Sequence, residues 1–252
     1  MNEATDAHTD MPALDGKKVV VTGGTTGIGR AVAVLLASYG ASTFICGRDA
    51  RHLTDALERI NQVGKGAGLA IDLAEPDNIS RFFDAAAAHL GGVDIAVINA
   101  AIPAGALSEM SEADLRYAIA TDFTAYLLSA HAACGLLKDH GDIVFIGSMS
   151  AHVLGGESAV YAGMKYGIQG FAEALRKELG PKGIKVGLIE PGKTGADFQY
   201  PEIPAEKQRA MIEREEMLRA EDIAVAVHYM VTQPRRAVVQ QLTIAPRSQA
   251  KE

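Results

Sequence analysis

The sequence predicts an α/β fold: a single doubly wound domain with a parallel sheet of about seven strands and helices on both faces. Three observations indicate this fold. Strand-like runs alternate regularly with helical segments along the 252 residues, the strands are almost continuously apolar, and no linker, repeat or shift in composition divides the chain. Regular alternation implies βαβ units with right-handed crossovers. Apolar strands are typical of a parallel sheet that is covered on both faces.

In the first half, three strand–helix pairs follow one another. The run 17–22, KKVVVT, is rich in β-branched residues and is followed by glycines, which is the pattern of a buried strand. The segment Gly27–Tyr39 has the apolar spacing of a helix and stops at Gly40, a suitable C-cap residue. The other expected elements are strands at Thr43–Cys46 and Gly68–Ile71, with helices at Ala50–Val63 and from Pro76 onward.

The second half repeats this scheme. Its expected elements are strands at Val93–Ile98, Asp142–Ile146, Ile184–Ile189 and Val238–Ile244, long helices at Ser111–Lys138 and Ser158–Leu179, and a charged helical stretch around Ala205–Met230. In a doubly wound sheet, ligands bind beyond the carboxyl ends of the strands. The segments that follow the strands are therefore the first place to look for functional residues.

Charge and cysteine content restrict the class of protein. With 24 Lys and Arg against 31 Asp and Glu, the net charge of −7 argues against a nucleic-acid or anionic-membrane binder. Cys46 and Cys134 lie in apolar settings and cannot form a disulfide framework, which suits a reducing compartment. The first residues are acidic and polar, and apolar runs such as Ala31–Ala37 are too short to span a membrane. A cytoplasmic location is expected.

A glycine cluster separates the first strand from the first helix. Gly23, Gly24, Gly27 and Gly29 let the backbone turn tightly and approach a pyrophosphate, which the N-terminus of the helix would bind. The spacing differs from the usual Gly-x-Gly-x-x-Gly, and a tight strand-to-helix turn with no ligand is the alternative. The position still favours a dinucleotide site formed by Gly23, Thr25, Thr26, Gly27, Ile28 and Gly29.

The end of the second strand distinguishes the two nicotinamide dinucleotides. An NAD site places a carboxylate there against the ribose 2′-hydroxyl, whereas an NADP site uses arginine against the 2′-phosphate. This chain reads Cys46-Gly47-Arg48, and its first carboxylate there is Asp49. A solvated arginine at the start of a helix is the alternative for Arg48. The sequence favours NADP(H), with charge-assisted bonds from Arg48 to the phosphate and added charge from Arg30.

Three side chains offer acid–base chemistry. Tyr161 and Lys165 are four residues apart in a helical segment, so they project from one face. A free phenol, with a pKa of about 10, is a poor base at neutral pH, and a nearby ammonium favours its phenolate. Ser148, just past the fifth strand, is placed to donate a hydrogen bond to a carbonyl oxygen that gains negative charge.

These residue types also suit roles outside catalysis. A Tyr-x-x-x-Lys pair arises by chance on helices, and a serine after a strand can simply cap a turn. His152 either lines a substrate pocket or is a solvated loop residue. The chain contains no Gly-x-Ser-x-Gly hydrolase elbow and no His-Glu-x-x-His or Cys-x-x-Cys metal motif, so no metal is expected.

Six motifs in order along the chain resemble those of a known family. They are Thr22-Gly-Gly-Thr-Thr-Gly-Ile-Gly29, Asp72 after the third strand, Asn99-Ala-Ala101 after the fourth, Ser148 followed thirteen residues later by Tyr161, Lys165, and Pro191-Gly192 after the sixth. With these motifs, residues 17–244 resemble a short-chain dehydrogenase/reductase with a Rossmann-type fold. The resemblance implies that Tyr161 exchanges the proton, Ser148 polarises the carbonyl, and Lys165 binds the nicotinamide ribose.

The resemblance also implies cofactor contacts and an assembly. Asp72 and Leu73 would lie at the adenine, Asn99 near the adjacent ribose, and Ile189 to Thr194, with Pro191 and Gly192, at the nicotinamide. Family members form dimers or tetramers through helices matching Ser111–Lys138 and Ser158–Leu179, so a homodimer or homotetramer is expected. Small residues that would allow such packing are Ala162, Gly163, Gly167 and Gly170.

Two positions depart from the family pattern. Ala101 stands where glycine is usual and adds a methyl group near the cofactor. Asp122 stands where the family normally has an Asn that holds a water for proton relay to the lysine. A carboxylate also accepts hydrogen bonds from water, but it favours the ammonium form of Lys165. We expect Asp122 to substitute functionally for Asn with a changed pH profile; an eroded catalytic set is the alternative.

The sequence thus leads to two candidate functions. The first is an NADP-dependent oxidoreductase that interconverts a carbonyl and a primary or secondary alcohol. The second is a non-catalytic nucleotide-sensing or scaffold protein on the same fold. We expect a flexible segment at 1–13, a catalytic domain at 14–247, and a substrate lid around 195–217. The lid's apolar residues are Phe198, Tyr200, Met211 and Met217; Glu213–Glu216 suits a solvated face, and Lys193 hints weakly at an acidic substrate.

Overall fold

One parallel sheet organises the described part of the chain. The computed structural model describes residues 11–195 and 203–248. Within them, seven strands form a sheet in the order β3-β2-β1-β4-β5-β6-β9. The strands are β1 (Lys18–Val21), β2 (Ser42–Gly47), β3 (Lys65–Ala70), β4 (Val93–Ile98), β5 (Leu137–Ile146), β6 (Lys185–Pro191) and β9 (Gln241–Ile244). The predicted α/β fold class is confirmed.

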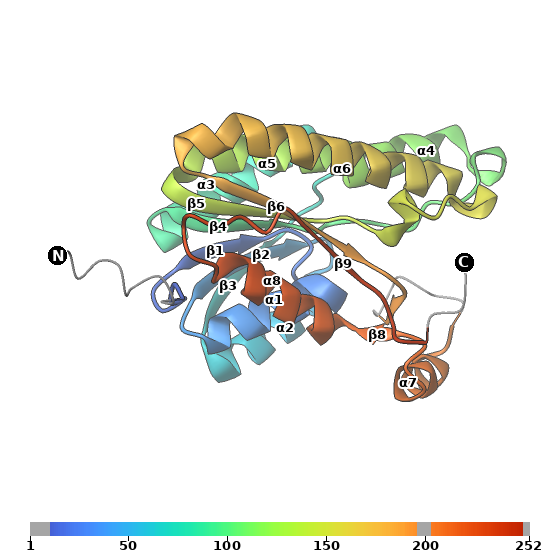
Figure 1. The fold of residues 1–252 in the computed structure, drawn as a ribbon, viewed down its shortest axis with the longest axis horizontal. Helices are drawn as coiled ribbons and strands as arrows, with labels where there is room; N and C mark the ends of the chain where they lie inside the picture. Colours follow the sequence, from blue (N-terminus) through green and yellow to red (C-terminus); the bar gives the residue numbers. More distant parts are fainter. Residues whose placement is uncertain (1–10, 196–202, 249–252) are drawn as a thin grey trace.

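Helices cover both faces of this sheet, as Figure 1 shows. One face carries α1 (Gly27–Ser38), α2 (Ala50–Val63) and α8 (Ala220–Val231). The opposite face carries α3 (Pro76–Leu90), α5 (Ala125–Leu136) and α6 (Ala159–Leu179), and α4 (Glu112–Ile119) continues this layer. Among the described residues, none of these helices is long and apolar enough to cross a membrane.

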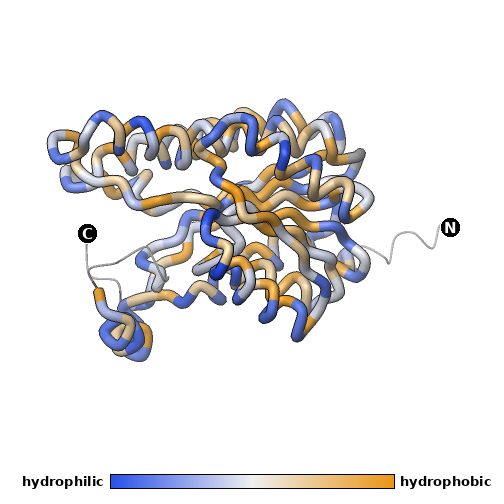
Figure 2. The backbone as a smooth tube through the Cα atoms, turned by 180° about the vertical axis from the view of Figure 1, so that it is seen from behind, coloured by the Kyte–Doolittle hydropathy of each residue, from blue (hydrophilic) through white to orange (hydrophobic). Residues whose placement is uncertain are grey.

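The alternating geometry of the strands divides the core into two layers. On β1, Val20 packs into the layer of α3, α5 and α6, whereas Val19 and Val21 pack into the layer of α1, α2 and α8. All three side chains are buried, which explains why the strand is apolar at successive positions. Figure 2 shows the hydrophobic strands at the centre of the molecule, between the two helical layers.

The strand order reverses between β1 and β4. The chain runs outward from β1 to β2 and β3, and then returns to place β4 on the other side of β1. At such a switch point, the segments after neighbouring strands diverge and leave room for a ligand. The loops after β1 and β4 therefore border the expected cofactor site.

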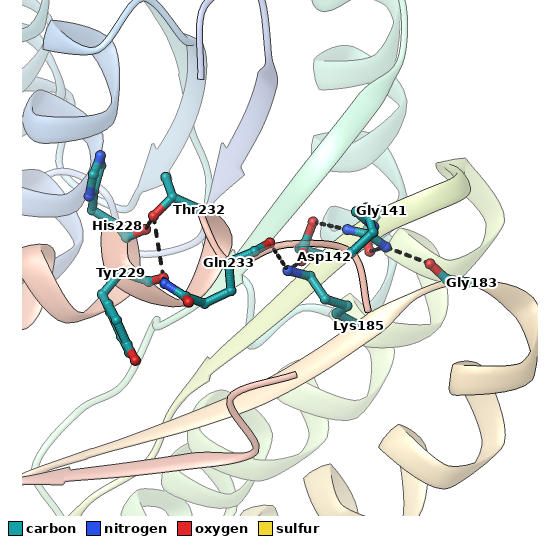
Figure 3. Close-up of polar contacts among 9 residues, drawn as sticks. Gly141, Asp142, Gly183, Lys185, His228, Tyr229, Thr232 and Gln233 are labelled. Carbon is teal, nitrogen blue, oxygen red and sulfur yellow. Dashed lines mark hydrogen bonds and ion pairs between the residues drawn. The ribbon is translucent and has the colours of Figure 1, made fainter. Parts of the chain in front are cut away.

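A charged cluster lies at the amino-terminal end of β6, at the end of the sheet opposite the expected cofactor site. Lys185 Nζ lies 3.2 Å from Asp142 and also donates to the Gln233 carbonyl at 3.1 Å. Arg235 pairs with Asp142 at 2.8 Å and donates to the Gly183 carbonyl at 2.6 Å. Figure 3 shows these contacts joining β5, β6 and the segment after α8. Burial raises the pKa of Asp142, and the two cations oppose this effect. These contacts give the cluster a structural role.

Of two segments that the sequence predicts as long helices, the structure keeps one and divides the other. Ser111–Lys138 contains α4, a π-helical turn at Ala120–Thr124, and α5. The stretch Ala205–Met230 contains α7 (Ala205–Glu213), the short strand β8 (Leu218–Arg219), and α8. β8 pairs with β7 (Thr194–Gly195), so an extended segment separates α7 from α8. The helix expected at Ser111–Lys138 is therefore confirmed over Glu112–Leu136 with a π-helical turn inside it, whereas the single helix expected at Ala205–Met230 was wrong, because β8 separates α7 from α8.

Some expectations fall on residues outside the described ranges. Most of the expected flexible segment 1–13 lies there, as do the lid residues Phe198 and Tyr200. The described part of the expected lid includes Met217, which is buried. The cysteines are free thiols; Cys46 is buried and Cys134 is half-buried.

Candidate active site

The turn between β1 and α1 has no room for side chains at two glycines. Gly23 has a φ of +64°, and a Cβ there would lie 2.7 Å from the Cα of Ala100. A Cβ on Gly29 would lie 2.2 Å from the Gly23 carbonyl oxygen. Asn99, after β4, donates from Nδ2 to the carbonyls of Thr22 and Gly23 at 3.1 and 3.2 Å. Asn99 therefore fixes the glycine turn from the neighbouring strand.

The N-terminus of α1 suits an anion. Its N-cap residue, Thr26, makes no side-chain capping hydrogen bond within the described chain, and the first turn has no acidic residue. The first backbone N–H groups of a helix lack helical partners and carry the positive end of its dipole. The exclusion of side chains at Gly23 and Gly29 brings a ligand close to this backbone. The turn therefore fits a dinucleotide phosphate.

The residues expected at the adenosine make a contact that the sequence motifs do not reveal. The exposed Arg48 donates to the hydroxyl of Tyr117, and its guanidinium lies 5.6 Å from the Tyr117 ring centroid. The Tyr117 hydroxyl in turn donates to Asp72 at 2.7 Å. Asp49 faces elsewhere and caps α2 by accepting from the backbone N–H groups of Arg51 and His52 at 2.7 and 3.2 Å.

Ser148 and the two residues from α6 form the candidate catalytic group. Ser148 lies just after β5, where its hydroxyl accepts from the Ser150 backbone at 3.1 Å and bonds to the Ser150 hydroxyl at the same distance. Tyr161 and Lys165 lie one turn apart near the start of α6, which packs against the short turn Met149–Ala151. The ammonium of Lys165 lies 5.5 Å from the Tyr161 ring centroid.

Lys165 is almost completely buried and its hydrogen bonds fix its position. Its Nζ donates to the hydroxyl of Tyr126 at 2.9 Å and to the carbonyl of Ile146 at 3.2 Å. Tyr126 donates to the same carbonyl at 2.9 Å. Burial lowers the pKa of Lys165 to about 8, and the nearby charge of Asp122 opposes that shift. The ammonium is thus held by a tyrosine that no sequence motif singled out.

Asp122 lies in the π-helical turn and is fully buried. Its Oδ1 accepts from the Ile102 backbone N–H at 2.8 Å. Its Oδ2 has no hydrogen-bond partner among the described residues. Burial raises the pKa of this carboxyl to about 6, while Lys165 and the Ile102 N–H oppose the shift. Asp122 therefore connects the loop after β4 to the surroundings of Lys165.

The segment after β6 borders the nicotinamide end expected from the sequence. Thr194 is buried and donates to the Gly192 carbonyl at 2.9 Å, while the Gly192 N–H bonds to Ile244 at 2.7 Å. Leu218 donates to the Lys193 carbonyl at 2.8 Å and connects this segment to β8. The other residues predicted to bind cofactor lie at or after the ends of β1, β3 and β6: Thr25, Thr26, Gly27, Ile28, Leu73 and Pro191.

His152 lies against the open edge of the sheet. Its Nε2 lies 2.7 Å from a carboxylate oxygen of the buried Glu190, which also accepts from Gln241 and Thr243. His152 lines a hollow between α6 and the β6–β9 edge; none of the described residues of the candidate catalytic group lines it. The structure thus places the His152 side chain against the Glu190 carboxylate at this sheet edge. No cluster of metal ligands occurs among the described residues.

Comparison with known proteins identifies the family. The family model for short chain dehydrogenases matches residues 17–207. The chain belongs to the short-chain dehydrogenase/reductase family. A short-chain dehydrogenase from Burkholderia cenocepacia, crystallised with NADP, is 30% identical; the match covers 95% of this chain and 100% of that one, with a TM-score of 0.84. A dehydrogenase/reductase from Sinorhizobium meliloti, also 30% identical, matches over 92% and 95% of the two chains with a TM-score of 0.82.

Curated relatives support the same family assignment. A putative ketoacyl reductase of the granaticin polyketide synthase from Streptomyces violaceoruber is 34% identical over 76% of this chain and 73% of that protein. An uncharacterised oxidoreductase from Staphylococcus aureus is 28% identical over 94% and 100% of the two chains. As a short-chain dehydrogenase/reductase, this protein is an oxidoreductase that uses a nicotinamide cofactor.

Proposed function

We propose that this short-chain dehydrogenase/reductase uses NADP(H) to interconvert a carbonyl and a primary or secondary alcohol, with reduction as its main direction. One observation carries the proposal: the buried Lys165 ammonium lies beside the Tyr161 ring, next to the turn that contains Ser148. A binding protein has no need for a buried cation at this place. Burying an ammonium is costly even when it has hydrogen-bond partners, so a buried lysine at this place supports a chemical role.

The chain's own groups would divide the proton chemistry. The bound nicotinamide supplies or accepts the hydride. Tyr161 gives its phenolic proton to the carbonyl oxygen during reduction and takes it back during oxidation. Ser148 donates a hydrogen bond to that oxygen as negative charge develops on it. Lys165 stabilises the phenolate that Tyr161 leaves behind, and Asp122 favours the ammonium form of Lys165.

NADP(H) is the cofactor that the charges favour. Arg48 is exposed at the end of β2, and Asp49, the nearest carboxylate in the sequence, caps α2. Without a carboxylate at the strand end, the 2′-phosphate meets an arginine instead of a like charge. The solved relative from Burkholderia cenocepacia carries NADP, which is consistent with this assignment.

We propose further roles for the segments around the site. Residues 14–247 form the catalytic domain, and 195–217 covers the substrate, with Met211 and Met217 on its apolar side. A homodimer or homotetramer would pack through α5 and α6, where a Cβ at Gly163 or Gly170 would meet open space. The acidic composition and the free thiols of Cys46 and Cys134 suit a reducing, cytoplasmic environment.

A non-catalytic nucleotide sensor is the second candidate. The observation that favours it is Asp122, a buried carboxylate with one unpartnered oxygen in place of the family's usual Asn. The decisive experiment follows NADPH absorbance over a panel of ketones and aldehydes, for the wild type and for Tyr161→Phe. Oxidation of NADPH that Tyr161→Phe abolishes supports the enzyme. Activity that survives the substitution refutes the mechanism, and NADPH binding without turnover of any carbonyl favours the sensor.

A further inference from the structure

Three side chains from three separate segments form a chain of contacts at the adenosine end. Arg48 follows β2, Asp72 follows β3, and Tyr117 reaches them from α4. Arg48 donates to the Tyr117 hydroxyl, and that hydroxyl donates to Asp72 Oδ2 at 2.7 Å. We refer to Arg48, Tyr117 and Asp72 as the adenosine triad. The motifs that identify the family include Asp72, but Tyr117 belongs to none of them.

The acceptor end of the adenosine triad is fixed by its own turn. Asp72 Oδ1 accepts from the Ala74 backbone at 2.9 Å, and its carbonyl accepts from the Asn78 side chain at 2.9 Å. The carboxylate therefore keeps its orientation without help from Tyr117. A phenol has one proton, so a hydroxyl that donates to Asp72 meets Arg48 as an acceptor. The direction of both hydrogen bonds is thus determined.

Tyr117 also separates the two charges. Arg48 is an exposed side chain, and a carboxylate is the partner with which it would otherwise pair directly. The phenol lies between them: its hydroxyl receives one guanidinium N–H, and the guanidinium lies 5.6 Å from the ring centroid. One of the five N–H donors of Arg48 is engaged in this way, and Arg48 forms no direct ion pair with a residue in the described part of the chain. An ordered cation with donors to spare is a suitable partner for a phosphate.

We propose that Tyr117 is a specificity-determining residue that positions Arg48 for the 2′-phosphate and prevents it from pairing with Asp72. The inference rests on the proposed use of NADP(H). Loss of the hydroxyl frees Arg48 and leaves Asp72 Oδ2 open to an ion pair with it. Both effects weaken binding of NADPH. The loss of Arg48 from the 2′-phosphate does not affect NADH, which has no such phosphate, and a change at Asp72 acts equally on both cofactors because they share the adenine.

The test measures the dissociation constants of NADPH and NADH by nucleotide fluorescence, so it needs no substrate. The variants are Tyr117→Phe, Arg48→Ala and the double variant, with the exposed Tyr39→Phe as the matched control. We expect Arg48→Ala to weaken NADPH at least tenfold. Tyr117→Phe should weaken NADPH three- to tenfold and change NADH less than twofold. In the Arg48→Ala background, Tyr117→Phe should have no further effect on NADPH.

The outcomes separate the inference from the function on which it rests. If the wild type does not prefer NADPH, or if Arg48→Ala leaves NADPH affinity intact, the proposed NADP use fails and the inference fails with it. If the wild type prefers NADPH through Arg48 but Tyr117→Phe binds NADPH equally well or more tightly, only the inference is overturned. An equal loss for NADPH and NADH also overturns it. Thermal melting of each variant identifies losses caused by misfolding.

Discussion

Replacing Asp122 by Asn should change how the stability of the protein depends on pH. The carboxyl is fully buried, and burial raises its pKa from 3.8 to about 6. A carboxyl with a higher pKa in the folded state favours folding in its protonated form. Its contribution is therefore greatest below pH 3.8 and is lost as pH rises toward 6. The amide that replaces the carboxyl in the variant does not titrate, so this loss should disappear.

The size of the effect follows from the pKa shifts of Asp122 and Lys165. A change from 3.8 to about 6 corresponds to about 3 kcal/mol of destabilisation by the ionised carboxylate near pH 7. The substitution also removes the charge that supports the Lys165 ammonium, whose pKa is about 8, and that pKa falls further. This second effect offsets part of the gain at pH 7. A net relative stabilisation of about 1–2 kcal/mol remains, or about 2–8 °C in Tm for a chain of this size.

The assay is thermal melting of wild type and Asp122→Asn from pH 4.5 to 7.5, with Asp84→Asn, an exposed carboxyl on α3, as the control. The difference in Tm between Asp122→Asn and wild type should grow as pH rises from 4.5 to 7, while the control stays flat. The pH at which kcat/KM changes with the ionisation of Lys165 should move to a lower value. A Tm difference that does not vary with pH would refute the electrostatic reasoning, and an unchanged activity profile would refute the coupling of Asp122 to Lys165.

Three further substitutions test separate parts of the structure. Tyr161→Phe should lower kcat by about 10²- to 10⁴-fold in NADPH oxidation assays, with NADPH affinity unchanged within about twofold; full activity would contradict its acid–base role. Gly29→Ala, whose Cβ would lie 2.2 Å from the Gly23 carbonyl oxygen, should weaken NADPH at least about tenfold in fluorescence titrations because the turn must shift. Arg235→Gln removes a cation paired with the buried Asp142 and should cost about 1–3 kcal/mol in denaturant unfolding, without changing cofactor affinity. A loss of cofactor affinity in Arg235→Gln would mean that the charged cluster around Asp142 is coupled to the cofactor site.

Local patterns were sufficient to predict the elements whose ends are set by neighbouring residues. The helix expected at Ala50–Val63 has those bounds in the structure, because the Asp49 side chain caps its first turn. The π-helical turn inside the helix at Ser111–Lys138 has no such local signal; within it, Asp122 bonds to the Ile102 backbone, which is distant in the sequence. β5 likewise begins at Leu137, before the expected Asp142, because Leu137 pairs with Val93 across a register shift.

In the candidate site too, the sequence identified residues whose chemistry is evident from residue type and missed residues whose role depends on tertiary contacts. Charged and glycine residues at fixed spacings pointed to Arg48, Lys165 and the turn after β1, because their chemistry is evident from residue type. Tyr117 and Tyr126 had no such signal, since a single tyrosine on a helix also suits an ordinary packing position. The role of each tyrosine depends on the partner that the fold brings close to it, which is Arg48 for Tyr117 and Lys165 for Tyr126.

Both tyrosines hold a cation by the same physical means. A phenolic oxygen accepts from the cation while its own proton goes to a second, fixed acceptor: the Asp72 carboxylate for Tyr117 and the Ile146 carbonyl for Tyr126. The cation is oriented without being neutralised, so it can still act on a further negative group. For Arg48 that group would be a cofactor phosphate, and for Lys165 the phenolate of Tyr161. A phenylalanine at either position would keep the packing and lose the orientation. Tyr117→Phe should therefore alter recognition with little effect on folding, whereas Tyr126→Phe should alter proton transfer and also lower stability, because it removes an acceptor from the buried Lys165 ammonium.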